Sequence, residues 1–223
     1  MIFAERKSIE EILAMIRGHK RVLLVGCATC VAECAAGGEE EVETLAPLLR
    51  MALAQKGGKI EIRTKTLERQ CEWEFVEELK KLLPDVDAVL SLGCGIGVQA
   101  LAERFPETRI YPGVNTSALA LRAEQGVWVS RCAACGDCIL DETFGICPVA
   151  RCAKGLMNGP CGGTRPDGKC ELSEETDCAW KLIVERANAA GALDELRKVR
   201  KPKDWSSARH GGPKRVVRED LRT

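Results

Sequence analysis

Eight cysteines between residues 132 and 178 constrain the fold of this 223-residue chain more than any other feature. The stretch that holds them is rich in glycine and has no sustained helical or strand periodicity. Such a segment buries little apolar surface, and thiolate-bound metal is a common substitute. We therefore expect bound metal to replace a hydrophobic core there. The eight residues are Cys132, Cys135, Cys138, Cys147, Cys152, Cys161, Cys170 and Cys178.

The N-terminal sequence and the apolar runs indicate the cellular compartment. The chain is charged from Glu5 onward and has no apolar run suited to a signal peptide. Its longest apolar runs fall far short of the roughly 20 residues that span a bilayer. We therefore expect a cytoplasmic protein without a membrane span. Thiols stay reduced in the cytoplasm, so the thirteen cysteines favour metal binding over disulfides.

Charge and histidine content exclude several classes of function. Lys and Arg together number 33, as do Asp and Glu, which argues against a dedicated nucleic-acid-binding protein. Only His19 and His210 are present, and neither lies in a cysteine cluster. This excludes Cys2His2 zinc fingers and hydrolytic zinc sites with histidine ligands, and leaves a Cys–His nucleophilic pair without support.

Ahead of the cysteine-rich region, short apolar runs alternate with amphipathic segments. This rhythm predicts a small parallel sheet covered by helices, an α/β fold of the Rossmann or flavodoxin-like type. Ser8 and Glu11 form a capping-box pattern at the start of the first helix, whereas Pro47 predicts a kink or a later start in the second. Strands are predicted at 21–26, 59–64, 87–93 and near 109–111, and helices at 8–17, 39–57, 72–83 and 98–105.

The change in amino-acid composition and periodicity along the chain suggests three parts. Residues 1–128 are expected to form the α/β domain, and residues 129–196 an irregular cysteine-rich metal-binding domain closed by a helix at 177–190. The remaining tail, 197–223, has ten basic residues against three acidic ones. We expect this tail to dock on a partner or to be disordered.

The N-terminal cysteines follow the predicted strands. Cys27 comes directly after the first strand, Cys71 lies between the second strand and its helix, and Cys94 directly follows the third. The carboxyl ends of parallel strands share one edge of a sheet, where ligands bind. Cys27, Cys30 and Cys34 supply three closely spaced thiolates, and Cys71 or Cys94 could supply a fourth. This cradle is common for a [4Fe–4S] cluster, with structural zinc as the alternative.

Glycines surround Cys94 in the stretch GCGIGVQ. We expect Gly93, Gly95 and Gly97 to let backbone N–H groups approach cluster sulfurs and tune their potential. The same stretch could be a dinucleotide fingerprint, but Val98 occupies the place of the last glycine in G-x-G-x-x-G. The spacing therefore favours the metal-binding interpretation.

The C-terminal cysteines can form two further sites. Cys132, Cys135 and Cys138 have C-x2-C-x2-C spacing, and Cys147-Pro148 follows after a gap longer than that of bacterial ferredoxins. Each site fits either a [4Fe–4S] cluster or zinc, and spacing leaves open which distal cysteine completes which site. The cysteines that remain for a second four-thiolate site are Cys152, Cys161, Cys170 and Cys178.

Two sets of motifs resemble one known family. CGDCILDETFGICPVARCAKGLMNGPCGG and GKCELSEETDCAWKLI, within 135–183, resemble the cysteine-rich C-terminal domain associated with methylenetetrahydrofolate reductase. VGCATCVAECAAGGEEEVETL, LERQCE and LSLGCGIGVQ resemble the small accessory subunit of two-subunit bacterial methylenetetrahydrofolate reductases. The resemblance covers about residues 20–190.

The resemblance implies a subunit and not a complete enzyme. In that family a TIM-barrel subunit carries the flavin, FMN or FAD, and the folate site, and this chain is too short to contain the barrel as well. Carried over, Cys27, Cys30 and Cys34 with Cys71 or Cys94 would hold one [4Fe–4S] cluster. The eight C-terminal cysteines would hold one or two further metal centres, which contain either iron–sulfur or zinc.

The function that the resemblance implies is electron transfer. The chain would relay electrons from a ferredoxin or another donor module to the flavin of the catalytic partner, which reduces methylenetetrahydrofolate to methyltetrahydrofolate. The alternative is a zinc-binding structural adaptor that stabilises or docks the flavoprotein. No catalytic residue is recognisable in this chain.

Overall fold

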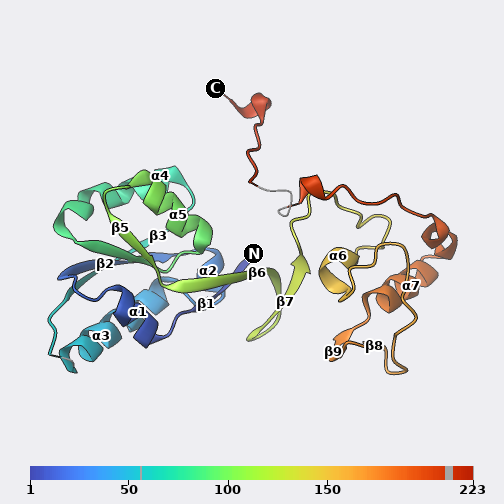
Figure 1. The fold of residues 1–223 in the computed structure, drawn as a ribbon, viewed down its shortest axis with the longest axis horizontal. Helices are drawn as coiled ribbons and strands as arrows, with labels where there is room; N and C mark the ends of the chain where they lie inside the picture. The colour runs from blue at the N-terminus through green and yellow to red at the C-terminus, as the bar shows by residue number, and fades with distance from the viewer. Residues whose placement is uncertain (56, 209–212, 223) are drawn as a thin grey trace. The chain divides into compact units, whose positions relative to one another are not determined.

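The structure is a computed structural model that describes residues 1–55, 57–208 and 213–222 (Figure 1). It divides into two compact units, Met1–Ala118 and Leu119–Thr223. The first is an α/β unit and the second is largely irregular, so the predicted fold class is confirmed. Residues 209–212 and 223 of the predicted tail, His210 among them, lie outside the described residues.

Four parallel strands form the main sheet of the first unit. They lie in the order β3-β2-β4-β5, and every neighbouring pair is parallel. The chain therefore goes from β2 to β3 on one side and then returns to β4 on the other. This reversal puts a topological switch point between β2 and β4, where open α/β sheets bind ligands. The strands are β2 (Arg21–Cys27), β3 (Glu61–Leu67), β4 (Ala88–Ser91) and β5 (Arg109–Pro112).

The helices follow the predicted order, with some differences from the prediction. Pro47 lies inside a helix that begins at Glu39, so the later start that Pro47 suggested is wrong. Pro47 is exposed, and the carbonyl that it leaves without a donor can be hydrated. The predicted helix at 72–83 is divided into α4 (Trp73–Val76) and the 3-10 turns η1 (Glu77–Lys81) and η2 (Leu83–Asp85). The other helices of this unit are α1 (Ile9–Met15), α2 (Cys30–Glu33), α3 (Glu39–Gln55) and α5 (Gly95–Arg104).

Both faces of the parallel sheet are buried. The side chains of Leu23 and Val25 pack into a core with residues of α4, η1 and α5, such as Leu79 and Leu101. Val22 and Leu24 alternate to the opposite face and are also buried, and α3 contacts β2 and β3. Figure 1 shows α1 and α3 on one side of the sheet and α4 and α5 on the other. A sheet covered on both faces leaves its strand ends as the accessible edge.

A second sheet was not predicted from the sequence. It has the order β1-β6-β7, in which β6 and β7 form an antiparallel hairpin closed at Gly126 with a positive φ of 77°. The boundary between the two units falls within β6. The strands are β1 (Ile2–Arg6), β6 (Val114–Glu124) and β7 (Val127–Cys132).

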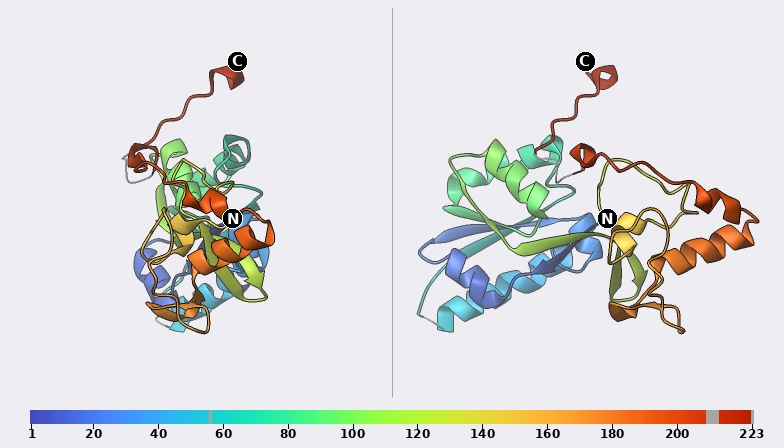
Figure 2. Two further views of the ribbon diagram at one scale, coloured as in Figure 1. Left: turned by 90° about the vertical axis from the view of Figure 1, so that its right-hand side faces the viewer. Right: turned by 45° about the vertical axis from the view of Figure 1, so that its right-hand side comes forward.

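The second unit has little regular structure apart from α7 (Ala179–Ala189), which confirms the predicted helix at 177–190 (Figure 2). A small core of Ile146, Ala179, Trp180 and Ile183 packs at this helix. The apolar face of α7 thus supplies a small core to this unit, and the expectation that metal replaces a hydrophobic core between residues 132 and 178 stays a prediction. The remaining elements are α6 (Pro148–Arg151), β8 (Lys169–Cys170), β9 (Ser173–Asp177), η3 (Leu193–Arg197), η4 (Trp205–Ser207) and η6 (Glu219–Leu221).

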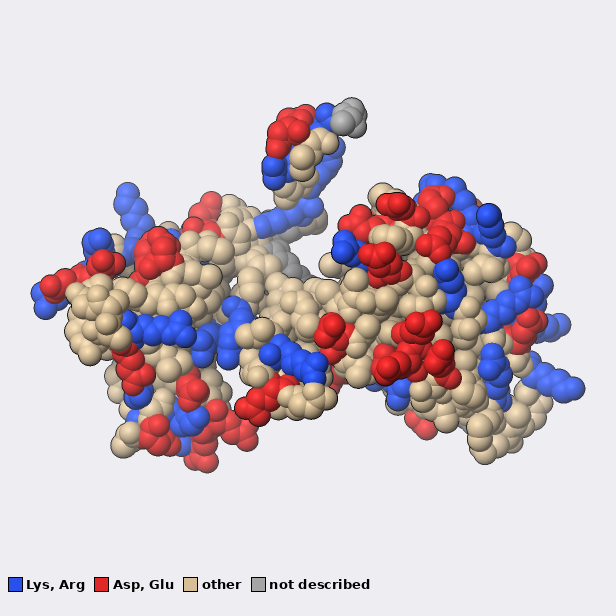
Figure 3. Space-filling view, turned by 180° about the vertical axis from the view of Figure 1, so that it is seen from behind, with Lys and Arg blue, Asp and Glu red and all other residues tan. Residues whose placement is uncertain are grey.

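Surface charge and hydropathy agree with the composition. Lys and Arg are interspersed with Asp and Glu on the face seen in Figure 3, as expected when both groups number 33. Within the described residues, the helices are too short or too polar to cross a membrane.

Candidate metal centres

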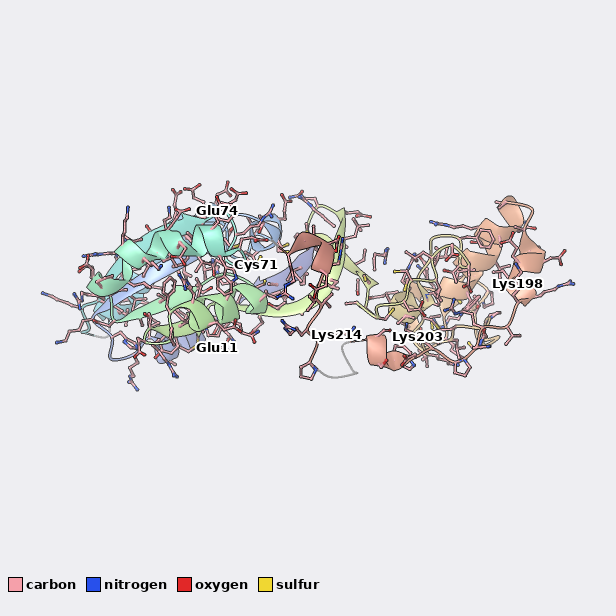
Figure 4. All side chains as sticks on the ribbon, turned by 90° about the horizontal axis from the view of Figure 1, so that it is seen from above. Glu11, Cys71, Glu74, Lys198, Lys203 and Lys214 are labelled. Carbon is pink, nitrogen blue, oxygen red and sulfur yellow. The ribbon has the colours of Figure 1, made fainter. Side chains whose placement is uncertain are left out.

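Cys27, Cys71 and Cys94 come together at the carboxyl edge of the parallel sheet. Cys27 is the last residue of β2, and Cys94 is the N-cap of α5 after β4. The Cys27 thiol lies 3.9 Å from the carbonyl oxygen of Glu68, in the segment that leads to Cys71. Burial raises the pKa of the Cys71 thiol, and the nearby thiols of Cys27 and Cys94 raise it further. Cys71, labelled in Figure 4, lies just ahead of α4.

Cys30 and Cys34 lie at the two ends of the short helix α2. Cys34 is buried, and its thiol donates to the carbonyl oxygen of Ile2 at 3.5 Å. Burial is the main cause of the raised pKa of the Cys34 thiol, and the nearby Cys30 thiol raises it further. The sequence offered Cys71 and Cys94 as alternatives, whereas the structure places both Cys27 and Cys94 near Cys71.

Gln70 holds the strand ends beside these thiols. This side chain is almost fully buried, and its amide nitrogen donates to the carbonyl oxygens of Val25 at 3.0 Å and Gly26 at 2.9 Å. Its amide oxygen accepts from the hydroxyl of Ser91 at 2.5 Å. Sequence reasoning missed Gln70 and Ser91. The only available signal was a glutamine directly before Cys71, which alone does not indicate burial.

The glycines around Cys94 have a packing role that the sequence did not predict. The N–H of Gly93 donates to the Ser91 hydroxyl at 3.1 Å, and the N–H of Gly95 donates to the Thr116 hydroxyl at 2.9 Å. A Cβ atom at Gly93 would lie 2.4 Å from the Gln70 amide oxygen, and one at Gly97 would lie 2.8 Å from the Gln70 Cβ. Gly93 and Gly97 are therefore required for the close approach of Gln70.

The loop from Cys132 to Cys138 has a thiolate-binding conformation. The N–H of Ala134 donates to the Cys132 sulfur at 3.3 Å, and Ala134 and Gly136 both have positive φ values, 50° and 79°. Backbone donors aimed at cysteine sulfur stabilise the thiolate that a metal requires. Cys135 in this loop is buried, whereas Cys132 and Cys138 are exposed.

Cys147 is the N-cap residue of α6. The helix α6 contacts β7, and Cys132 is the last residue of β7. The grouping of Cys147 with the C-x2-C-x2-C loop stays a prediction.

The other four C-terminal cysteines line a single narrow cavity. Trp180 and Arg151 also contribute to its wall. The N–H of Gly163 donates to the Cys161 sulfur at 3.4 Å, the same local pattern as at Cys132. The sequence predicted that these four cysteines suffice for one four-thiolate site, and the structure places all four around this cavity: Cys152, Cys161, Cys170 and Cys178.

The surroundings of Cys178 in this cavity favour its thiolate form. Burial alone would raise its pKa, but the Thr164 hydroxyl at 3.0 Å and the N–H groups of Lys181 and Trp180 lower it below its usual value. Cys178 is also the N-cap residue of α7, whose dipole favours a negative sulfur.

Three arginines of the second unit, Arg131, Arg151 and Arg186, lie near one another. Burial lowers the pKa of the Arg151 guanidinium, and the charges of Arg131 and Arg186 lower it further, whereas Asp177 and Cys147 act in the opposite direction. Clustered guanidinium groups repel one another unless an anionic group lies nearby. A metal bound by four thiolates carries net negative charge and would supply one.

The thiols stand near one another without forming closed sites. All thirteen cysteines are free, and within the described parts of the chain no three His, Cys, Asp or Glu side chains are arranged to hold a metal ion. Metal binding displaces thiol protons and draws the ligands together. The aimed N–H donors, the shared cavity and the arginine cluster fit thiolate-bound metal. His19, one of the two histidines, contacts Tyr111 through its Nε2 at 3.0 Å.

Comparison with known proteins agrees with this organisation. No curated protein matches the chain. Residues 111–206 match the model of the family described as "Methylene-tetrahydrofolate reductase C terminal". The matched segment contains all eight cysteines from Cys132 to Cys178. The cysteine-rich part of the chain is thus similar to the C-terminal region of methylenetetrahydrofolate reductases and is related to their subunits.

Proposed function

We propose that this chain is the electron-transfer subunit of a methylenetetrahydrofolate reductase complex. The observation that carries the proposal is the convergence of Cys27, Cys71 and Cys94 at the open edge of the sheet, in a chain whose other unit matches the reductase family. This edge lies at the switch point between β2 and β4, where α/β sheets bind cofactors.

The N-terminal site would hold a [4Fe–4S] cluster. Cys27, Cys71 and Cys94 are three ligands, and Cys30 or Cys34 on the adjacent α2 is the fourth. A bound cluster supplies one-electron chemistry at a potential set by its hydrogen bonds and burial. The chain's contribution is to hold the ends of β2 and β4 through Gln70 and to cover the sheet below them with the apolar core.

The C-terminal unit would hold two further thiolate centres. Cys132, Cys135, Cys138 and Cys147 form one ligand set, and the cavity cysteines, Cys152, Cys161, Cys170 and Cys178, form the other. Each set suits either zinc or [4Fe–4S]. The partner is the flavin-containing reductase subunit, and FMN or FAD would be bound only there. Electrons would arrive from a ferredoxin or another donor module.

One observation favours a zinc-binding adaptor as the second candidate. Among the described residues of the second unit, the apolar core at α7 is a small cluster of four buried side chains, so metal at the two ligand sets would be needed to fold the unit. In this case the chain would stabilise or dock the flavoprotein without transferring electrons.

Anaerobic co-purification with the flavoprotein separates the two functions. The electron-transfer function predicts ~4 or more iron atoms per chain with matching acid-labile sulfide. It also predicts that the partner's flavin is reduced by an external one-electron donor only when this chain is present. Zinc alone, with equal flavin reduction in the absence of the chain, would support the adaptor.

A further inference from the structure

Lys203 is a buried cation within the basic tail. Its side chain is 1% exposed, and its Nζ lies 3.2 Å from Oδ2 of Asp137 and 5.6 Å from the centre of the Trp205 ring. The contact with Asp137 has the distance of an ion pair but not the geometry of a hydrogen bond, so Nζ has no hydrogen-bond acceptor among the described residues. A desolvated ammonium group without an acceptor is unfavourable unless another anionic group approaches it. Lys203 is labelled in Figure 4, near η4.

Arg200 is a second cation that contacts Asp137. Its guanidinium contacts Asp137 at 3.2 Å and pairs with Glu142, while its Nε is buried and also lacks an acceptor among the described residues. Asn158 fixes the backbone of Arg200 on both sides, donating to its carbonyl at 3.1 Å and accepting from its N–H at 2.8 Å. Two cations therefore share one carboxylate, and both retain unused donors.

The segment that carries both cations, residues 198–208, is called the strap here. It packs on the backbone of the loop from Cys132 to Cys138. The Ser207 hydroxyl donates to the carbonyl oxygen of Cys135 at 2.9 Å. A Cβ atom at Gly136 would lie 2.4 Å from the carbonyl oxygen of Ser207, so the strap and the loop are in direct contact. Asp137, which holds both cations, lies between Cys135 and Cys138 in the same loop.

We propose that the strap is part of the metal centre formed by Cys132, Cys135, Cys138 and Cys147, with Lys203 and Arg200 as positioning residues. The inference rests on the proposed thiolate sites. Four thiolates around zinc or an iron–sulfur cluster leave a net negative charge, and nearby cations stabilise it most at the buried ligand, Cys135. The unused N–H donors of Lys203 and Arg200 supply that compensation and can donate to thiolate sulfur.

The tail therefore has a function within this chain. The sequence indicated partner docking or disorder for residues 197–223. The strap instead places two of the tail's cations against a cysteine loop, so its removal should open one metal centre without affecting the others.

Metal release from the full chain tests the proposal. Lys203→Met removes the charge and keeps the side-chain stem, whereas Lys201→Met is the matched control, because Lys201 is exposed two residues earlier. After addition of a chelator, Lys203→Met should lose one centre's metal at least about tenfold faster than the wild type, and Lys201→Met should match the wild type. Alkylation mapped by mass spectrometry should show that Cys135 and Cys138 lose protection before Cys161 and Cys178.

Two further variants keep the test decisive. Lys203→Arg retains the charge and the N–H donors and should restore slow metal release. Lys203→Gln, which also lacks the charge, distinguishes an effect of the lost charge from an effect of altered packing. Circular dichroism establishes that each variant is folded. Release from Lys203→Met at the wild-type rate, or equally fast release from every centre, would overturn the inference while leaving the proposed function intact. A wild-type chain without metal at these four cysteines would overturn the inference together with the second metal site of the proposed function.

Discussion

The Ser91 hydroxyl donates a hydrogen bond of 2.5 Å to the amide oxygen of Gln70, and the Gln70 amide nitrogen in turn donates to the carbonyl oxygens of Val25 and Gly26. One buried side chain thereby joins the carboxyl ends of β2 and β4 across the switch point. Gln70 directly precedes Cys71, so it also fixes the segment that brings this thiol to Cys27 and Cys94. The candidate N-terminal metal centre therefore has a hydrogen-bonded support that contains no cysteine.

Gln70→Ala should destabilise the first unit and impair its metal site. The change removes a donor from the carbonyl oxygens of Val25 and Gly26 and the acceptor of the Ser91 hydroxyl, while Val25 keeps the N–H of Leu92. Each buried group left without a partner costs about 1–3 kcal/mol. Urea denaturation followed by circular dichroism should show the loss. Gln99→Ala is the control, because Gln99 is exposed and bonds only to Gly95 of its own helix. Equal stabilities of the two variants would contradict this role for Gln70.

The glycines beside Cys94 should respond differently to the same substitution. Gly93→Ala and Gly97→Ala force a Cβ atom against Gln70 and should lower the free energy of unfolding by about 1–3 kcal/mol, as overpacking does. Gly95→Ala meets only the Thr116 hydroxyl at 3.8 Å, and alanine is favoured over glycine in a helix by up to about 1 kcal/mol. Thermal unfolding of the metal-free proteins distinguishes them. A Gly95→Ala variant as unstable as Gly93→Ala would refute the packing explanation.

The parallel sheet was predictable because hydrophobic periodicity determines it. Leu23 and Val25 pack on one face of β2 and Val22 and Leu24 are buried on the other, and an apolar run ending in glycine carries that information locally. The hairpin of β6 and β7 was not predicted, because several residues of both strands are exposed and their pattern is weak. Its prediction required information on the pairing of residues that lie farther apart in the sequence.

The cysteine groups were predictable only in part. Strand ends meet at one edge in any parallel sheet, so the approach of Cys27, Cys71 and Cys94 could be expected. The roles of Gln70 and Lys203 could not, because each depends on burial created by residues distant in the chain. Single glutamines and lysines in a sequence are usually exposed.

Asp87 should make stability depend on acid pH. Its carboxylate accepts from the N–H groups of Lys20 and Arg21 and from the Arg21 guanidinium, which lowers its pKa from 3.8 to about 2. A depressed pKa contributes stability that is present above the unfolded value and is lost as pH falls from about 4 towards 2. The urea midpoint of Asp87→Asn should therefore decline less than that of the wild type in this window. Parallel declines would contradict the prediction.

Metal removal should affect the two units unequally. The first unit has an apolar core between its sheet and helices, whereas the second has only the small core at α7. Chelation should therefore increase hydrogen exchange of backbone amides in 132–178 while those of β2 and β3 keep their protection. Restoring the metal should restore the protection. Equal loss of protection in both units, or none in either, would show that metal does not stabilise the second unit selectively.

Iron content and electron paramagnetic resonance of the anaerobically purified, reduced chain test the proposed N-terminal cluster. We expect a cluster signal with ~4 iron atoms at the N-terminal site. Cys27→Ser should abolish that signal, and Cys161→Ser, which alters the separate cavity in the second unit, should leave it intact. A wild-type chain that contains zinc and no iron, or a signal unchanged in Cys27→Ser, would rule out an iron–sulfur cluster at Cys27.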